Sequence, residues 1–124
     1  MNRTFLVALG MSLAGAAWSQ QYPSKPITVV SAFAAGGTSD FVGRLVMEKI
    51  RENVGWNMIL EVKAGANCHI GTEYGAKAAP DGYTLTLGPS STHALNPAIF
   101  PKLNYDVARD FVGITPVATV ANVM

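Results

Sequence analysis

Two short stretches combine glycine with small hydroxyl side chains, a combination suited to holding an anion. The first, "AAGGTSD" at residues 34–40, follows an apolar run and precedes an amphipathic stretch. The second, "GPSSTH" at residues 88–93, follows another apolar run. Glycine lets a ligand approach the backbone, and hydroxyl and free N–H groups donate hydrogen bonds to an anion. An ordinary turn with Thr38 or Ser39 as the helix N-cap explains the first stretch equally well.

Other chemistries find less support in the residue pattern. Neither a Gly-x-Gly-x-x-Gly run nor a Gly-x-x-x-x-Gly-Lys-Ser/Thr run is present, and Asp40 would repel a diphosphate, which argues against nucleotide binding. Cys68 and His69 are adjacent but lack a third metal ligand, so no metal site is expected. A hydrolase or isomerase using Ser90 or Ser91 with His93 is the alternative function, although no Gly-x-Ser-x-Gly elbow is present.

The order of elements predicts an α/β fold with a mostly parallel sheet. Alternating strands and helices of this kind form right-handed crossovers, and ligands bind beyond the carboxyl ends of such strands. Both glycine and hydroxyl stretches follow strands and therefore belong at that edge. The expected strands are Ile27–Phe33, Met58–Val62, Tyr83–Leu87 and Val112–Val120, and the expected helical segments are Ser39–Asn53, Ile70–Ala78 and Pro97–Phe100.

The two ends of the chain carry separate signals. Residues 1–19 have a basic start at Arg3, an apolar stretch, and small residues at Ala17 and Ser19, which predicts a cleaved secretory signal and a periplasmic location. Residues 20–124 then form one small unit.

The formal charge of +1, without a Lys/Arg cluster, argues against nucleic-acid binding. Because the sequence stops within the apolar run "PVATVANVM", we expect a fragment of a longer chain.

Three motifs give the chain a family resemblance. They are "YPSKPITVVSAFAAGGTSDFVGRLV", "GANCHIGTEYGAKAAPDGYTLTLG" and "NPAIFPKLNYDVARDFVGIT". Together they cover nearly all of the chain after Tyr22, and they resemble the periplasmic solute-binding proteins of tripartite tricarboxylate transporters, the Bordetella-uptake-gene type receptors.

The resemblance implies a two-lobed Venus flytrap that closes on a carboxylated solute without catalysis or a cofactor. It implies a monomer that hands its ligand to integral membrane subunits. Residues 20–124 would be the N-terminal part of the first lobe, with the second lobe absent. Loop 64–70 is a further candidate for the cleft wall. The ligand-binding residues implied are Phe33, Ala34, Ala35, Gly36, Gly37, Thr38, Ser39 and Asp40 in the first loop, and Gly88, Ser90, Ser91, Thr92 and His93 in the second.

The chain departs from the family pattern at two places. Ala35 replaces a proline, and "GANCHIGTE" replaces "GAGGNIGTE", which puts larger side chains at Cys68 and His69. The chain is also short, since family members run to about twice its length or more. Half of a flytrap would bind weakly, because closure buries a ligand from both sides. A truncated exported product without a function of its own is therefore the third hypothesis.

Overall fold

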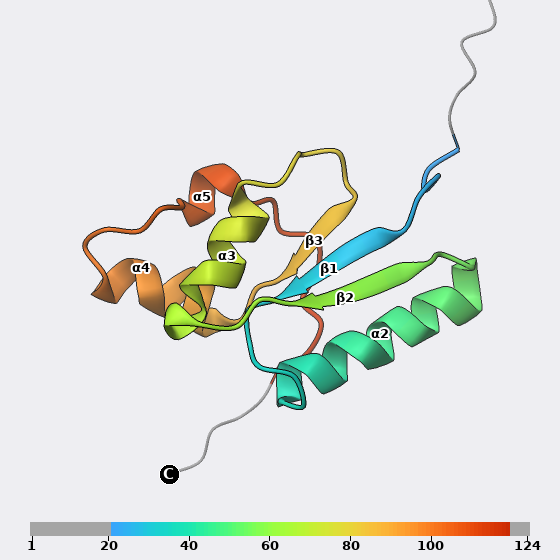
Figure 1. Ribbon diagram of the computed structural model, residues 1–124, viewed down its shortest axis with the longest axis horizontal. Helices are drawn as coiled ribbons and strands as arrows, with labels where there is room; N and C mark the ends of the chain where they lie inside the picture. Colours follow the sequence, from blue (N-terminus) through green and yellow to red (C-terminus); the bar gives the residue numbers. More distant parts are fainter. Residues whose placement is uncertain (1–20, 120–124) are drawn as a thin grey trace, which may run out of the picture.

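The computed structural model describes residues 21–119, so the predicted signal at residues 1–19 lies outside the described residues. Three parallel strands form the sheet: β1 (Ile27–Ser31), β2 (Met58–Val62) and β3 (Thr84–Leu87), in the order β2-β1-β3. Two longer helices connect them, α2 (Thr38–Val54) and α3 (His69–Ala76). The predicted parallel α/β fold is confirmed (Figure 1).

The central strand β1 forms the core of the molecule. Its residues Ile27, Val29, Val30 and Ser31 are all buried. A strand covered on both faces reads as a continuous apolar run, which is why "ITVV" lacks the alternation of a half-exposed strand. The buried strand β1 therefore fixes the position at which the loop of residues 32–37 begins.

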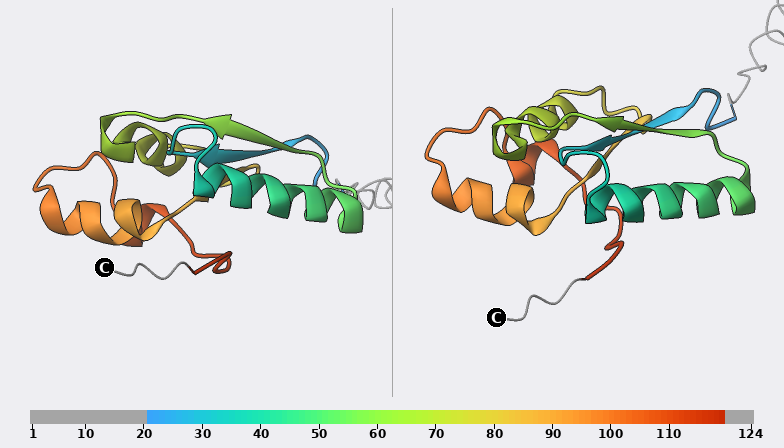
Figure 2. Two further views of the ribbon diagram at one scale, coloured as in Figure 1. Left: turned by 90° about the horizontal axis from the view of Figure 1, so that it is seen from below. Right: turned by 60° about the horizontal axis from the view of Figure 1, so that its bottom comes forward.

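Helices α2 and α3 cover opposite faces of the sheet (Figure 2). A Cβ placed on Gly43 of α2 would lie 2.8 Å from Leu87 Cδ1, and one on Gly75 of α3 would overlap Thr86 Oγ1. Thr86 and Leu87 are neighbours in β3 and point to opposite faces of the sheet. The two glycines thus let each helix approach the sheet closely. Within residues 21–119, no helix combines the length and apolar character that crossing a bilayer requires.

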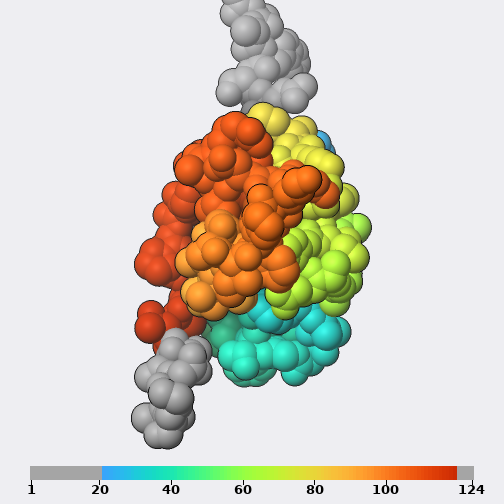
Figure 3. Space-filling view, turned by 90° about the vertical axis from the view of Figure 1, so that its left-hand side faces the viewer, coloured from blue at the N-terminus to red at the C-terminus, as the bar shows by residue number. Residues whose placement is uncertain are grey.

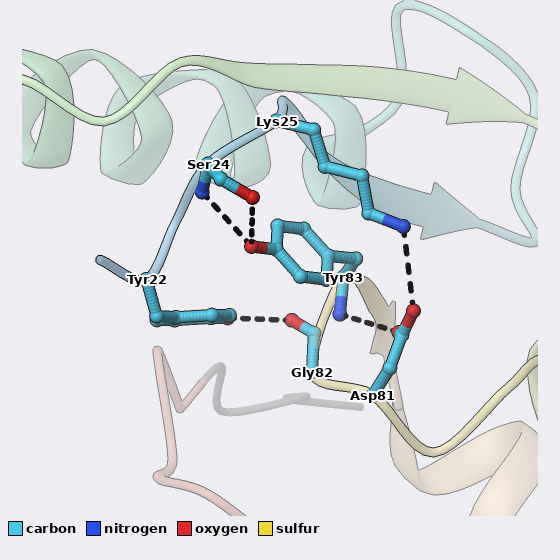
Figure 4. Close-up of polar contacts among 6 residues, drawn as sticks. All are labelled: Tyr22, Ser24, Lys25, Asp81, Gly82 and Tyr83. Carbon is cyan, nitrogen blue, oxygen red and sulfur yellow. Dashed lines mark hydrogen bonds and ion pairs between the residues drawn. The ribbon is translucent and has the colours of Figure 1, made fainter. Parts of the chain in front are cut away.

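A polar cluster joins residues 22–25, just before β1, to the turn before β3 (Figure 4). Tyr22 Oη donates to Gly82 O at 2.6 Å, and the backbone N–H of Ser24 donates to Tyr83 Oη at 2.9 Å. Lys25 Nζ lies 3.4 Å from Asp81 Oδ2 and 4.3 Å from the centre of the Tyr83 ring. Two of the motifs that carry the family resemblance are therefore bonded to each other, at the amino end of the sheet.

The remaining helices are short and lie beyond the carboxyl ends of the strands (Figure 1). They are the 3₁₀ turn η1 (Ala66–Cys68), the π-type turn η2 (Ser91–Leu95), α4 (Asn96–Ile99) and α5 (Val107–Asp110). α5 was not predicted, and Asp106 caps it by accepting the N–H groups of Ala108 and Arg109 at 2.9 and 3.1 Å.

The predicted strand Val112–Val120 is wrong for the part that the structure describes. Residues 111–119 contain no strand, and the side chains of Val112 and Ile114 are 91% and 75% exposed. An apolar run becomes a strand only when another backbone pairs with it, and in this sheet β1 pairs with β2 and β3 alone. High β propensity was therefore not sufficient.

Candidate functional site

The two predicted ligand loops leave the same edge of the sheet side by side. β1 and β3 are adjacent and parallel, and Ser31 pairs with Leu87 at their carboxyl ends. The end-on view shows the first loop, drawn in cyan, next to the light orange residues that follow β3 and the yellow-green residues of loop 64–70 (Figure 3). The arrangement expected from the parallel topology is thus present.

The first loop turns the chain from β1 into α2 without a side-chain cap. Gly36 has a φ of +85°, a left-handed conformation that favours glycine. Gly37 is the N-cap, no side chain caps the helix, and the first helical hydrogen bond runs from Phe41 N to Gly37 O at 3.0 Å. The expected capping residue, Thr38 or Ser39, is therefore wrong, because Gly37 is the N-cap; Asp40 does lie in the first turn, as the ordinary-turn interpretation expects. The N–H groups of the first turn have no acceptor within the helix, as at any helix start, and no capping side chain of Gly37 accepts them.

Asp40 is the most constrained residue of the first loop. It is 6% exposed, and its Oδ2 accepts the N–H of Gly36 at 3.0 Å. Arg44, one helical turn further, donates its Nε–H to both carboxylate oxygens at 3.1 and 3.2 Å. These bonds, led by that from Arg44, lower the pKa of the Asp40 carboxyl. The Asp40 carboxylate is therefore already bonded within the protein. The turn that it stabilises contains the other predicted ligand residues of this loop: Phe33, Ala35, Gly36, Gly37, Thr38 and Ser39.

The second loop is partly helical, contrary to the prediction. Gly88 and Ser90 are exposed, but Ser91, Thr92 and His93 belong to η2. The Thr92 side chain is fully buried, and its hydroxyl lies 3.1 Å from Pro89 O and 2.7 Å from His93 Nδ1. Among the predicted residues of this loop, Gly88 and Ser90 are thus the more accessible.

His93 packs as a structural residue. Its ring lies against Gly88, where a Cβ would come within 2.8 Å of His93 Cε1, and 4.8 Å from the centre of the Phe111 ring. Burial lowers its pKa. It lines an open pocket of about 380 Å³ together with residues of α4 and α5, and no residue of loop 33–40 takes part. Because its Nδ1 contacts Thr92, and Ser91 Oγ is buried without a hydrogen-bond partner, the geometry lends no support to the hydrolase hypothesis.

Loop 64–70 contains a bond that sequence reasoning missed. Asn96 is buried, and its Nδ2 donates to Asn67 O at 3.2 Å while its Oδ1 accepts from Asn67 Nδ2 at 3.4 Å. Ala66, Asn67 and Cys68 all have positive φ. No glycine or turn pattern in "ANC" indicates this conformation. Among the described residues, His, Cys, Asp and Glu side chains do not gather in any group of three that could hold a metal ion.

The parallel sheet, with two helix-covered faces and glycine loops at one edge, defines the chain as an α/β lobe of the periplasmic-binding-protein type. Residues 42–124 match the model of the tripartite tricarboxylate transporter family receptor. The chain belongs to that family, which confirms the resemblance.

Curated relatives and solved structures agree with this assignment. BugT of Bordetella pertussis is 34% identical over the whole chain, which spans 40% of that protein. A UPF0065 protein of Bordetella bronchiseptica is 37% identical over 97% of the chain and 36% of the relative. The structure of MatC from Rhodopseudomonas palustris with bound malate matches with a TM-score of 0.68 and 39% identity, over 73% of this chain and 31% of MatC. An R. palustris structure with adipate matches with a TM-score of 0.66 and 32% identity, over 70% and 29%.

Proposed function

We propose that this chain is the first-lobe portion of a periplasmic receptor that binds a small carboxylated solute and delivers it to the membrane subunits of a tripartite transporter. Residues 20–124 would form that portion after removal of a signal at residues 1–19. The chain spans about 40% of BugT, so the opposing lobe belongs to a longer protein of this type.

The observation that carries the proposal is the uncapped start of α2 beside the second loop. Gly37 leaves the first-turn N–H groups without a side-chain acceptor, and Thr38 and Ser39 add hydroxyl donors there. Gly88 and Ser90 follow the adjacent strand. A carboxylate fits such a set of neutral donors at the positive end of a helix. MatC with malate and the structure with adipate support a carboxylate as the ligand class.

Calorimetry with a panel of mono-, di- and tricarboxylates tests the function. We expect the full-length protein to bind at least one of them and Thr38→Val to weaken that binding about ten- to hundredfold, since one hydrogen bond to a charged group contributes about 1.5–3 kcal/mol. Thr84→Val, at the opposite end of the sheet, is the matched control. Absence of binding across the panel contradicts the proposal. Recovery of a chemically altered ligand would favour the hydrolase or isomerase alternative instead.

A further inference from the structure

The proposed anion site has a negative charge next to it. Asp40 lies in the first turn of α2. In the proposed function, the N–H groups of this same turn donate hydrogen bonds to the ligand carboxylate. Its side chain is 8% exposed, so water screens its charge poorly. An unpaired carboxylate at this place would repel the carboxylate of a ligand.

Arg44 forms an ion pair with Asp40. Its Nη2 lies 3.0 Å from Asp40 Oδ1, in addition to the bonds that its Nε–H makes to both oxygens. The side chain of Arg44 is 59% exposed and extends from the turn of α2 that follows Asp40. The spacing of four residues places the two side chains on one helix face. Among the residues described, Arg44 is the charged side chain that acts on Asp40.

The same carboxylate also holds the ligand loop. Asp40 Oδ2 accepts the N–H of Gly36, the residue whose left-handed φ of +85° starts the turn into α2. Gly36 has open space around it, since a Cβ there would meet no atom within 4 Å. At Gly36 itself, the position of the loop is therefore fixed by the hydrogen bond to Asp40, since no side chain packs there.

We propose that Arg44 is a positioning residue for the carboxylate site: it neutralises Asp40 at the start of α2 and holds the Asp40 carboxylate where it fixes the Gly36 N–H. The inference rests on the proposed function and deepens it. It assigns Arg44, rather than Asp40 alone, to the ligand site, without a direct contact between Arg44 and the ligand.

Three variants of the full-length protein test the charge balance, with the tightest-binding carboxylate of the panel as the probe. Arg44→Gln leaves the Asp40 charge uncompensated and should weaken binding about tenfold. Arg51→Gln removes the same charge from the far end of α2 and should leave binding unchanged. Adding Asp40→Asn to Arg44→Gln should restore most of the affinity, because the negative charge is gone and an amide oxygen can still accept the Gly36 N–H.

Two results would overturn the inference: an Arg44→Gln variant that binds as tightly as Arg51→Gln, or a double variant that binds no better than Arg44→Gln. A purely structural role for Arg44 predicts the second result.

A measurement without ligand separates failure of this inference from failure of the proposed function. The amide signal of Gly36 reports the titration of Asp40, and its midpoint should move to higher pH in Arg44→Gln. An unmoved midpoint contradicts the positioning role even in a protein that binds no carboxylate.

Discussion

Asn67 and Asn96 exchange hydrogen bonds across the carboxyl end of the sheet. The Nδ2 of Asn96 lies 3.2 Å from Asn67 O, and the Nδ2 of Asn67 lies 3.4 Å from Asn96 Oδ1. These bonds join loop 64–70 to the start of α4, 29 residues later in the chain. Asn67 has a left-handed φ of 55°, and its bonds to Asn96 tie this residue to a segment outside its own loop.

Asn96→Ala should therefore destabilise the protein. It removes both hydrogen bonds to Asn67, and because Asn67 is exposed, water can replace the lost partner, so we expect the cost of an ordinary hydrogen bond, about 0.5–1.5 kcal/mol. Urea unfolding measures the change in the free energy of unfolding. Asn53→Ala, at an exposed position near the end of α2, is the matched control and should change stability little. Equal stability of the two variants would contradict the structural role of Asn96.

Cys68→Gly should stabilise the protein. Cys68 has a φ of 69°, and a side chain in this conformation costs about 1–2 kcal/mol relative to glycine. The gain should appear as a higher midpoint of thermal unfolding. Cys68→Ala keeps a Cβ and is the control, so it should not share the gain. If both variants behave alike, then loss of the thiol rather than relief of the backbone is the cause.

Tyr83→Phe should lower stability but leave ligand binding unchanged. The Tyr83 hydroxyl accepts the Ser24 N–H at 2.9 Å and lies 3.1 Å from Ser24 Oγ, at the end of the sheet opposite the ligand loops. Losing these bonds should cost about 0.5–1.5 kcal/mol. Tyr74→Phe, which keeps the ring beneath Lys63 Nζ, is the control. A loss of affinity in Tyr83→Phe would contradict the separation of the two ends of the sheet.

Stability should fall at acidic pH. The pKa values of four carboxyl groups are lowered in the folded protein: Asp40 mainly by Arg44, Glu73 by Lys77, Asp81 by the Tyr83 N–H, and Asp110 by Arg109, to about 2. The unfolded chain then binds more protons, so the stabilisation present above about pH 4 is lost as the pH falls towards about 2. The urea midpoint across this range measures the loss. Asp110→Asn should flatten the curve, and an unchanged slope would contradict the contribution of Asp110.

The sequence was sufficient to predict the elements whose pattern is local. The apolar run Met58–Val62 is a strand with those bounds, and the helical periodicity after Ser39 gives α2. Parallel topology correctly placed the two loops predicted to bind the ligand at one edge of the sheet. The ion pair of Asp40 with Arg44 was not predicted, although the two residues have the four-residue spacing of a helical pair, and the bond of Asp40 to Gly36 is seen only in the structure.

Features that depend on distant partners were not predictable. Residues 112–119 have the composition of a strand but no neighbouring backbone to pair with. The left-handed run Ala66–Cys68 lacks the glycine that signals such a conformation, and its support comes from Asn96. Likewise, the helical form of Ser91, Thr92 and His93 is accompanied by the hydrogen bond from Tyr105 Oη to Thr92 O at 3.1 Å.

The central claim is that a carboxylate binds at the start of α2 and beside the second loop. Backbone amide chemical shifts of the full-length protein, recorded during titration with the tightest-binding carboxylate, test it most directly. We expect the largest saturable shifts at Gly36, Gly37, Thr38 and Ser39, with a second group at Gly88 and Ser90. Shifts confined to the Tyr22 and Trp56 end of the sheet, or to the pocket beside Phe100 and Tyr105, would contradict it.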